Sequence, residues 1–428
     1  MRVEYVSHAS LRMVAGGTTL LTDPYFFLDP LEAQLATFFP PRTLTVEDFG
    51  PLDVVYCSHF HSDHSHPRTL ALLRDRIRTL VIPAGRRALL SRLKKLGFQD
   101  VVELEDEAPV TLHGFTLTSY LHPNDVDSAL IAQAEGQAVL HANDCVLSSE
   151  TLARMRAATP IDVAFMPHTM VQDLYPLLLP RGREVLRRLG AVREAQARQL
   201  LGDGVAALRP KLLVPYAYGI AYLNEDQLEL NTVGRTLPAQ FLAEVQARLP
   251  EQRGALMRPG DVVDVASLDI VRGSCARDWG ATEEEYLAAL RAFAAEGGAG
   301  TQRPSFGEPE ECEALLRRHF AHRLWLGLPS LLRRQVVSFH VVGETRRKTW
   351  SYDFAAKALV EGIPRPPVLE ITLPASSITN MLEHPAEYDP FMALYSHRIS
   401  FRSPLAGVGS AESEVAAYEE TFVLLFSR

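Results

Sequence analysis

The segment with the clearest chemical potential is residues 58–66, SHFHSDHSH, in which imidazoles alternate with small and acidic side chains. Histidine nitrogens and aspartate oxygens are common ligands of transition-metal ions. Alternate side chains at the end of a strand point the same way, so His59 and His61 can converge on one ion. Asp63 and His64, in the turn that follows, can reach a neighbouring position. The spacing predicts a cleft for one or two metal ions; the alternative is a solvated histidine-rich loop.

A short loop cannot enclose a metal ion by itself, so other segments must contribute ligands. His122 follows the β-prone run LTSYL and is the predicted third imidazole. Asp144 follows the run AVLHA, and its two equivalent carboxylate oxygens allow it to bridge two ions. For both residues an ordinary surface position is the alternative. The predicted ligands from these segments are His59, His61, Asp63, His64, His122 and Asp144.

Short β-prone runs alternate with helical patterns around these residues. Residues 52–57, LDVVYC, form an apolar run of the length expected for a strand buried on both faces, and this run ends at the histidine cluster. Pro67 suits the first turn of a helix, because its missing N–H is not needed there. The pattern continues with strand TLVIP, helix RRALLSRLKKLG, strand VVEL and strand AVLHAND. Strands that carry ligands at their ends, with helices outside, predict a layered α/β sandwich.

The chain has 428 residues, which exceeds the usual size of one hydrophobic core and favours two domains. We expect a metal-binding catalytic domain over residues 1–265. Residues 266–305 are expected to form a helical connection and a Gly-rich linker. The helical pattern PEECEALLRRHF and the β-prone runs QVVSFHVVG and KTWSYDF predict a smaller α+β domain over residues 306–428.

Composition narrows the classes of partner. Lys plus Arg number 43 and Asp plus Glu number 52, so the formal net charge is −9, which disfavours nucleic acid as the main partner. The sequence has no run of about 18 apolar residues and no signal-peptide pattern at its start, so we expect a cytoplasmic protein without a membrane span. Its four cysteines lie far apart without a C-x-x-C pair, which argues against disulfides and iron–sulfur sites.

The spacing H-x-H-x-D-H over residues 59–64, followed by His122 and Asp144, resembles the signature of the metallo-β-lactamase superfamily. The order of the segments LTDP, VVYCSHFHSDHSHPRTL, HPNDVDSALI, NDC, VPYAYGIAYLNE, ELNT and RPGDVVDV more specifically resembles the catalytic, non-Rieske part of the CMP-N-acetylneuraminate hydroxylase family. The resemblance implies a four-layer αββα sandwich for the first domain. The C-terminal domain is weakly similar to a sterol-carrier-like module.

The chain departs from most hydrolytic members of that superfamily in one ligand. Those members carry a further metal-binding histidine in a P-x-H segment after the bridging aspartate, whereas residues 215–218 here read PYAY. The hydroxylase family also lacks this histidine, so the gap favours that branch over a standard dizinc hydrolase. His168, after the apolar run DVAFM, is considered as a substitute ligand, with an ordinary loop residue as the alternative.

Other residues match the family's segments without being expected to bind metal. His8 lies in its H-A-S segment and Asp23 in its T-D-P segment. We expect both to orient the ligands, because ligating imidazoles usually need a hydrogen-bond acceptor behind them. His141 is expected either to support the ligands in the same way or to point to the opposite face. Hairpin stabilisation is the alternative for His8 and Asp23. Tyr216 and Tyr218 are expected either at the border of the substrate cleft or in the core.

The first functional hypothesis is oxidation of a small molecule by a non-heme oxygenase or hydroxylase with one or two iron ions. A set of histidines and carboxylates with vacant positions suits iron, because oxygen and substrate need free coordination sites. The hydroxylase family's Rieske domain, with its cysteine and histidine pairs, has no counterpart in this sequence. Electrons are therefore expected from a separate protein or from the substrate.

The second hypothesis is hydrolysis of an ester, lactone, amide or phosphodiester by a hydroxide bound to zinc or manganese. Asp63 would hold that nucleophile and Asp144 would link the ions, so these are the expected catalytic residues. Hydrolases dominate the superfamily, whereas the missing P-x-H histidine and the closer resemblance favour oxidation. We take the iron oxygenase as the first hypothesis. A metal-binding protein without catalysis is a third, which the open metal positions disfavour.

Overall fold

A computed structural model of the chain describes residues 1–25, 37–123, 126–169, 183–217, 219–225, 227–273, 277–297, 306–321, 334–383, 390–394, 398–403, 418, 421–423 and 425–426. The described residues form two compact units. The first unit is built from residues before 298, and the second mainly from residues after 305.

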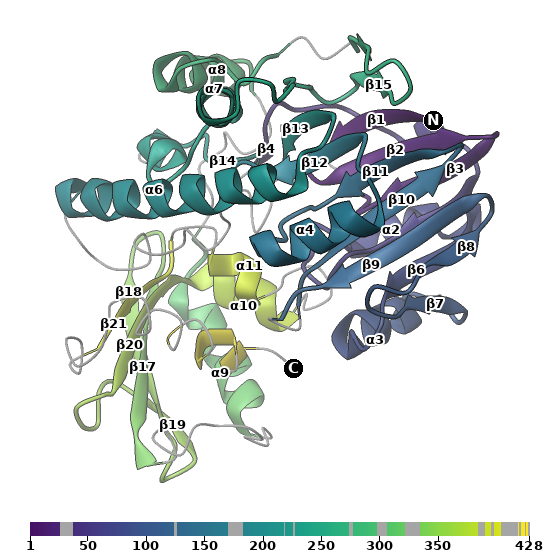
Figure 1. Ribbon diagram of the computed structural model, residues 1–428. Coiled ribbons are helices and arrows are strands. Elements are labelled where there is room, and N and C mark those ends of the chain that lie inside the picture. The colour runs from purple at the N-terminus through teal and green to yellow at the C-terminus, as the bar shows by residue number, and fades with distance from the viewer. Residues whose placement is uncertain are drawn as a thin grey trace. The chain divides into compact units, whose positions relative to one another are not determined.

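The first unit contains two large β-sheets (Figure 1). The first sheet has eight strands, in the order β16 (Ile270–Val271), β15 (Val262–Asp264), β1 (Arg2–Ser7), β2 (Ser10–Ala15), β3 (Thr18–Thr22), β5 (Leu52–Tyr56), β6 (Ile77–Pro83) and β7 (Val101–Leu104). β1 and β3 are each antiparallel to β2, and β3 is parallel to β5. The carboxyl ends of β1, β3 and β5 therefore lie at the same edge of the sheet.

The second sheet has six strands, in the order β13 (Leu212–Tyr216), β12 (Val163–Pro167), β11 (Gln137–His141), β10 (Ser128–Ala134), β9 (Phe115–Leu121) and β8 (Val110–Leu112). β10 is antiparallel to both β9 and β11, and β11 is parallel to β12. The first residue of β10 thus lies at the edge where β9, β11 and β12 end.

Alternating side chains explain why many strands are apolar throughout. In β5, Val54 and Tyr56 point into the core between the two sheets, whereas Val55 packs on the outer face of its sheet. In β12, Val163 and Phe165 point into the same central core. Both faces of these strands are covered, so both sets of side chains must be apolar.

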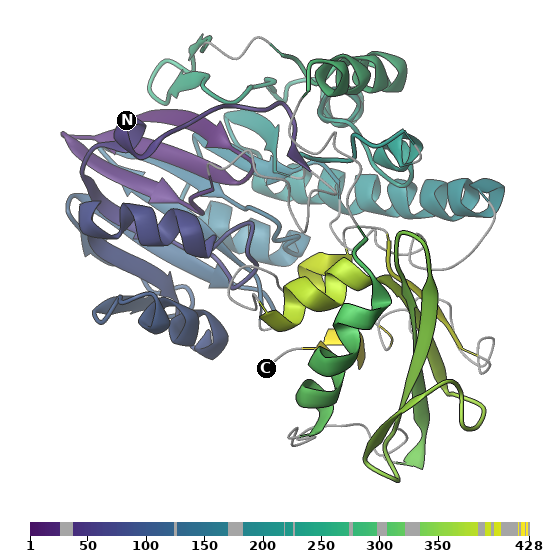
Figure 2. The same ribbon diagram turned by 180° about the vertical axis from the view of Figure 1, so that it is seen from behind.

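Helices cover the two outer faces. Leu70 and Leu89 belong to the hydrophobic cluster on the outer face of the first sheet, and Val205 and Phe241 to the cluster outside the second. Figure 2 shows the first sheet, with β1 to β3 in purple, from the side of its covering helices. The predicted four-layer αββα sandwich is confirmed. Its helices are α2 (Pro67–Leu73) and α3 (Arg87–Lys95) on one side, and α4 (Ser149–Ala158), α6 (Arg183–Leu208) and α7 (Pro238–Arg248) on the other.

Shorter elements complete the first unit. β4 (Thr37–Phe38) pairs with β14 (Ile220–Ala221) in a separate two-stranded ladder. Three 3₁₀ helices are η1 (Val46–Phe49), η2 (Arg74–Arg76) and η3 (Leu228–Thr232). Within the described part of the chain, no helix has both the length and the apolar character that crossing a membrane requires.

The first unit extends beyond Val265. β16 adds a strand to the first sheet, and α8 (Glu283–Ala295) buries Tyr286 and Leu290 in the core between the sheets. Trp279 joins the same core. Residues 266–297, expected as a connection, therefore belong to the first unit because their apolar side chains complete its core.

The second unit is an α+β structure. Its sheet has the order β19 (Ala358–Glu361), β18 (Arg347–Asp353), β17 (Val336–Val342), β20 (Leu369–Pro374) and β21 (Ser400–Arg402). Its helices are α9 (Pro309–Ala321), α10 (Ala375–Glu383) and α11 (Pro390–Leu394). Trp350 and Phe339 are fully buried. The sterol-carrier-like character of this unit stays a prediction.

Candidate metal centre

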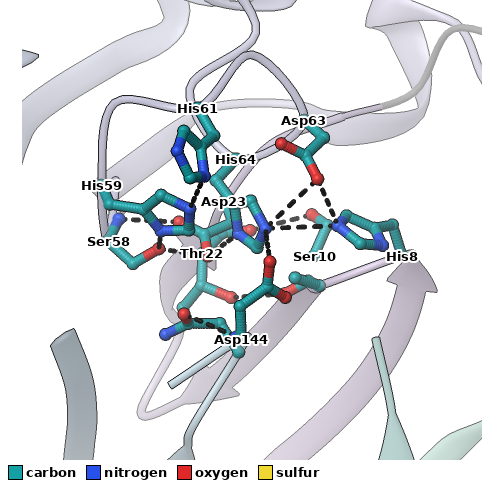
Figure 3. Close-up of polar contacts among 12 residues, drawn as sticks. His8, Ser10, Thr22, Asp23, Ser58, His59, His61, Asp63, His64 and Asp144 are labelled. Carbon is teal, nitrogen blue, oxygen red and sulfur yellow. Dashed lines mark hydrogen bonds and ion pairs between the residues drawn. The ribbon is translucent and has the colours of Figure 1, made fainter. Parts of the chain in front are cut away.

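The edge at which β1, β3, β5 and β11 end carries most of the side chains predicted to bind or orient metal (Figure 3). His8 directly follows β1, Asp23 follows β3 and residues 58–66 come just after β5. Asp144 comes after β11, behind a left-handed turn at Asn143 with φ 44°. The shared strand direction gathers residues that are far apart in the sequence.

His64 is the centre of one group of polar atoms. Its Nε2 lies 3.0 Å from Asp144 Oδ2 and 3.5 Å from Asp63 Oδ2. His8 Nε2 lies 3.3 Å from the same nitrogen and 3.2 Å from Asp63 Oδ2. All four side chains are nearly inaccessible to solvent. The structure thus places His8, which was expected behind the ligands, in direct contact with the predicted ligands Asp63 and His64.

His59 and His61 form a second group. His59 Nε2 lies 2.9 Å from His61 Nδ1, and Asp127 Oδ1 lies 4.0 Å from His59 Nε2. His59 Nδ1 is 3.0 Å from Ser58 Oγ, which fixes the ring on its other side. The side chain of Asp127 is 18% exposed, whereas that of His59 is 1% exposed. The cluster is therefore more open to solvent on the side of Asp127.

Asp23 lies behind both groups and fixes their orientation. Ser58 donates to it twice, from its backbone N and from Oγ, each at 2.7 Å. Asp23 Oδ2 also lies 2.9 Å from His64 Nδ1 and 3.1 Å from His141 Nε2. Burial alone would raise the pKa of Asp23, but the bonds from His141 and His64 hold this pKa well below its usual range. An ionised carboxylate behind His64 fixes Nε2 as the atom that faces the other polar groups.

Tyr216 supports this arrangement from the core. Its hydroxyl lies 2.7 Å from His141 Nδ1 and accepts a hydrogen bond of 2.6 Å from Asn143 N. Asn143 Oδ1 in turn accepts from Asp144 N at 2.7 Å. Burial raises the pKa of Tyr216 well above its ordinary value, so the hydroxyl keeps its proton. Tyr216 belongs to the core rather than to an open cleft, and Tyr218 lies outside the described residues.

Burial and charge shift the titration of the clustered groups. Burial would raise the pKa of Asp63, but His64 and His8 hold it well below its ordinary value, whereas burial raises the pKa of Asp144. Burial would lower the pKa of His64, but the carboxylates of Asp144 and Asp63 raise it well above its ordinary value. Burial lowers the pKa of His59. The two carboxylates therefore create a negative potential that a cation offsets.

The donor set fits a transition-metal ion. Asp63 Oδ1 is buried, and among the described residues it has no hydrogen-bond partner. Histidine nitrogens and carboxylate oxygens are the ligands expected for iron, zinc or manganese. His8, His64 and Asp144 offer ligand atoms that all lie within 4.8 Å of one another. The cluster is thus suited to hold one or two metal ions.

His168 is placed differently from its prediction as a substitute ligand. Its Nδ1 lies 2.7 Å from Thr236 O and its Nε2 lies 3.2 Å from Ala217 O. Burial lowers the pKa of His168 to about 4, so the ring is neutral near pH 7. The two ring nitrogens face backbone carbonyl oxygens of two loops, and a neutral ring donates to only one of them; the role of His168 as a substitute ligand stays a prediction.

The segment after β9 contributes a residue that the sequence analysis missed. This residue is Asp127, whose carboxylate approaches His59. Its backbone oxygen accepts a hydrogen bond of 3.0 Å from the backbone N–H of His122. The available signal was the position of Asp127 immediately before the apolar strand β10. The start of an antiparallel strand lies beside the ends of its neighbours, so an acidic residue there reaches the same edge.

Comparisons with known proteins agree with this fold. Residues 18–203 match the family described as Beta-lactamase superfamily domain. The chain is 26% identical over 241 residues to the 4-amino-L-phenylalanyl-[CmlP-peptidyl-carrier-protein] 3-hydroxylase of Streptomyces venezuelae, with 51% of this chain and 44% of that protein covered. It is 26% identical over 288 residues to cytidine monophosphate-N-acetylneuraminic acid hydroxylase of Xenopus laevis, with coverages of 63% and 46%.

A hydrolase is matched as well. The chain is 25% identical over 279 residues to a UPF0173 metal-dependent hydrolase of Opitutus terrae, with 62% of this chain and 100% of that protein covered. By contrast, the aligned region spans less than half the length of each of the two hydroxylases.

Replacement of Asp23 by asparagine is expected to weaken metal binding by about 10- to 100-fold, because the acceptor behind His64 and His141 is lost. Competition with a chromogenic chelator measures the affinity. Asp75→Asn is the matched control, since Asp75 is exposed and pairs with its neighbour Arg74 at the surface. Equal affinities for Asp23→Asn and the unchanged protein would contradict this role of Asp23.

The same carboxylate predicts a pH dependence of stability in the metal-free protein. The pKa of Asp23 is lower in the folded state than its unfolded value of about 3.9, so its stabilisation is complete above that pH and is lost as the pH falls. Between about pH 4 and pH 3, the free energy of unfolding should fall more steeply for the unchanged protein than for Asp23→Asn, by up to about 1.4 kcal/mol per pH unit. Urea unfolding at each pH measures it, and parallel curves would exclude a depressed pKa.

Proposed function

We propose that this protein is a non-heme iron oxygenase that uses one or two iron ions to hydroxylate a small molecule. The proposal starts from the match of residues 18–203 to the family described as Beta-lactamase superfamily domain. The alignments with two hydroxylases support the proposal. The protein would use the cluster of histidines and carboxylates at the edge of the two sheets.

The observation that carries the proposal is the combination of His59, His61 and Asp127. Two histidines and one carboxylate, with further positions open, form the ligand set of many non-heme iron oxygenases. Asp127 lies 4.0 Å from His59 on the more exposed side of the cluster. We propose Asp127 as the ligand of this position in place of His122, and we expect substrate to approach from this side.

The second metal position would be held by Asp63 and His64, and Asp144 would link the two positions. Asp144 follows β11, and its Oδ2 lies 3.0 Å from His64 Nε2. The depressed pKa of Asp63 keeps it a carboxylate near pH 7, and Asp23 holds His64 with Nε2 facing the ion. Bound iron would supply the activation of dioxygen.

Such a hydroxylation needs an electron source. One oxygen atom of dioxygen enters a C–H bond of the substrate and the other leaves as water, which consumes two electrons and two protons. Among the described residues, Cys57, Cys145 and Cys312 are free and buried, so they offer no iron–sulfur centre to relay electrons. We propose an electron-transfer partner as the source of these two electrons.

Hydrolysis is the second candidate, and the alignment with the whole length of a metal-dependent hydrolase favours it. Zinc or manganese would lower the pKa of a bound water to about 7, and the hydroxide would attack an ester, lactone, amide or phosphodiester. Asp63 would orient that hydroxide. We rank this candidate second because residues 215–218 read PYAY, where most hydrolytic members of the superfamily carry a further metal-binding histidine.

Protein purified without added metal is expected to contain iron, and after anaerobic reduction it should take up dioxygen in proportion to that iron. Elemental analysis and an oxygen electrode measure the two quantities. The His59→Ala variant, which loses a proposed ligand, should contain less iron and show a matching loss of uptake. Zinc in the purified protein, with turnover of generic esters or phosphodiesters and no oxygen uptake, would favour hydrolysis and exclude the first proposal.

The position of Asp127 predicts a contrast between two variants of one segment. Asp127→Asn removes the proposed anionic ligand and should lower iron affinity by at least about tenfold, an effect of the size that disturbed metal sites show. His122→Gln should retain iron, because the backbone N–H of residue 122 still donates to Asp127 O. The opposite pattern, with iron lost in His122→Gln and kept in Asp127→Asn, would restore His122 as the ligand.

A further inference from the structure

We infer that His8 is a metal ligand, which binds through Nε2 at the second metal position together with Asp63, His64 and Asp144. It supplies from the first hairpin the imidazole that the segment 215–217 does not provide. The inference rests on the metal centre of the proposed function but not on its reaction.

Four of the six distances among the facing atoms of His8, Asp63, His64 and Asp144 match a coordination sphere, and His8, His64 and Asp144 have ligand atoms that all lie within 4.8 Å of one another. Neighbouring ligand atoms around an ion at about 2.1 Å are about 3.0 Å apart in octahedral and about 3.4 Å apart in tetrahedral geometry. The measured separations run from 3.0 Å between His64 Nε2 and Asp144 Oδ2 to 3.5 Å between His64 Nε2 and Asp63 Oδ2. His8 Nε2 lies 3.3 Å from His64 Nε2 and 3.2 Å from Asp63 Oδ2, within this range.

Hydrogen bonding alone accounts poorly for this group. His64 Nδ1 faces the carboxylate of Asp23, so Nε2 is the ring nitrogen that faces the cluster. Two carboxylate oxygens and a second imidazole nitrogen surround Nε2, and a single N–H there can donate well to only one of them. Asp63 Oδ1 is buried and lacks a hydrogen-bond partner among the described residues. A central cation satisfies all of these atoms at once.

The backbone and the surroundings of His8 fix its ring in this position. His8 has φ 41°, a left-handed conformation that is uncommon for a residue with a side chain and that concentrates at functional sites. It lies in the tight turn between β1 and β2, where Ser7 pairs with Ser10. The ring stacks on Phe38, with centroids 4.1 Å apart and planes at 20°. Within the described part of the chain, its recorded polar contacts are made by Nε2, the atom that faces the cluster.

The competing role for His8 is purely one of positioning, in which Nε2–H donates to Asp63 and only orients that carboxylate. His8→Gln separates the two roles, because an amide N–H can still donate to Asp63 but binds transition metals weakly. A positioning role predicts that His8→Gln keeps metal binding and that His8→Ala loses it. A ligand role predicts that both variants lose it.

The test uses Co²⁺ titration of the full metal-free chain, followed by the visible absorption of the bound ion. We expect the unchanged protein to bind two Co²⁺ per chain. His8→Ala and His8→Gln should each weaken the second equivalent at least tenfold, with an altered Co²⁺ absorption spectrum. The first equivalent, at His59 and His61, should persist and so reports that both variants are folded.

His113→Gln is the matched control. His113 is also a histidine in a left-handed hairpin turn, with φ 48°, but its Nε2 bonds to Thr79 Oγ1 at 2.9 Å. This variant should bind Co²⁺ like the unchanged protein. The inference would be overturned if His8→Gln bound two Co²⁺ with unchanged affinity and spectrum. It would also be overturned if the unchanged protein bound a single Co²⁺ and both His8 variants retained that ion.

The Co²⁺ titration tests the role of His8 independently of the reaction that the protein catalyses. If the purified protein proves to be a zinc hydrolase, the oxygenase proposal fails while the Co²⁺ result for His8 still stands. If iron and oxygen uptake are found but the His8 variants bind Co²⁺ normally, the oxygenase proposal stands and the inference about His8 fails.

Discussion

The buried carboxylate of Asp23 accepts hydrogen bonds from Ser58, His64 and His141, and the geometry of the metal cluster depends on it. A buried charge is stable only when its partners satisfy it, and here four donor groups do so. In return, the carboxylate fixes the tautomer and the rotation of His64, and through Ser58 it also fixes the side of His59 that faces the cluster. One residue thus orients predicted ligands in both proposed metal positions.

The same constraint explains why the core behind the site is polar at a few positions. Tyr216 and His141 lie between the two sheets, where apolar side chains would otherwise pack, and they extend the hydrogen-bond chain from Asp23 to Asn143. A fully connected polar network keeps a single geometry in a medium of low dielectric constant. The cost of burying Asp63 and Asp144 close together remains, and a bound cation would offset it.

Much of the site could be predicted from the sequence, because its ligands are consecutive. His59, His61, Asp63 and His64 share one loop, so their proximity follows from spacing alone. Asp23 and His141 could be expected behind the ligands because a buried metal-binding imidazole needs an acceptor. The surroundings of His168 could not be predicted in the same way, since only the tertiary structure places carbonyl oxygens of two loops beside its ring nitrogens.

The sequence by itself determined the layered α/β class, since apolar runs and helical periodicity are local properties of the chain, and it determined the histidine loop that begins the site. The tertiary structure decided which distant residues complete that site. His8 and Asp127 enter the cluster because β1 runs parallel to β5 and because β10 starts where β9 ends. Strand direction and register set these positions, and neither is encoded in the spacing of the residues along the chain.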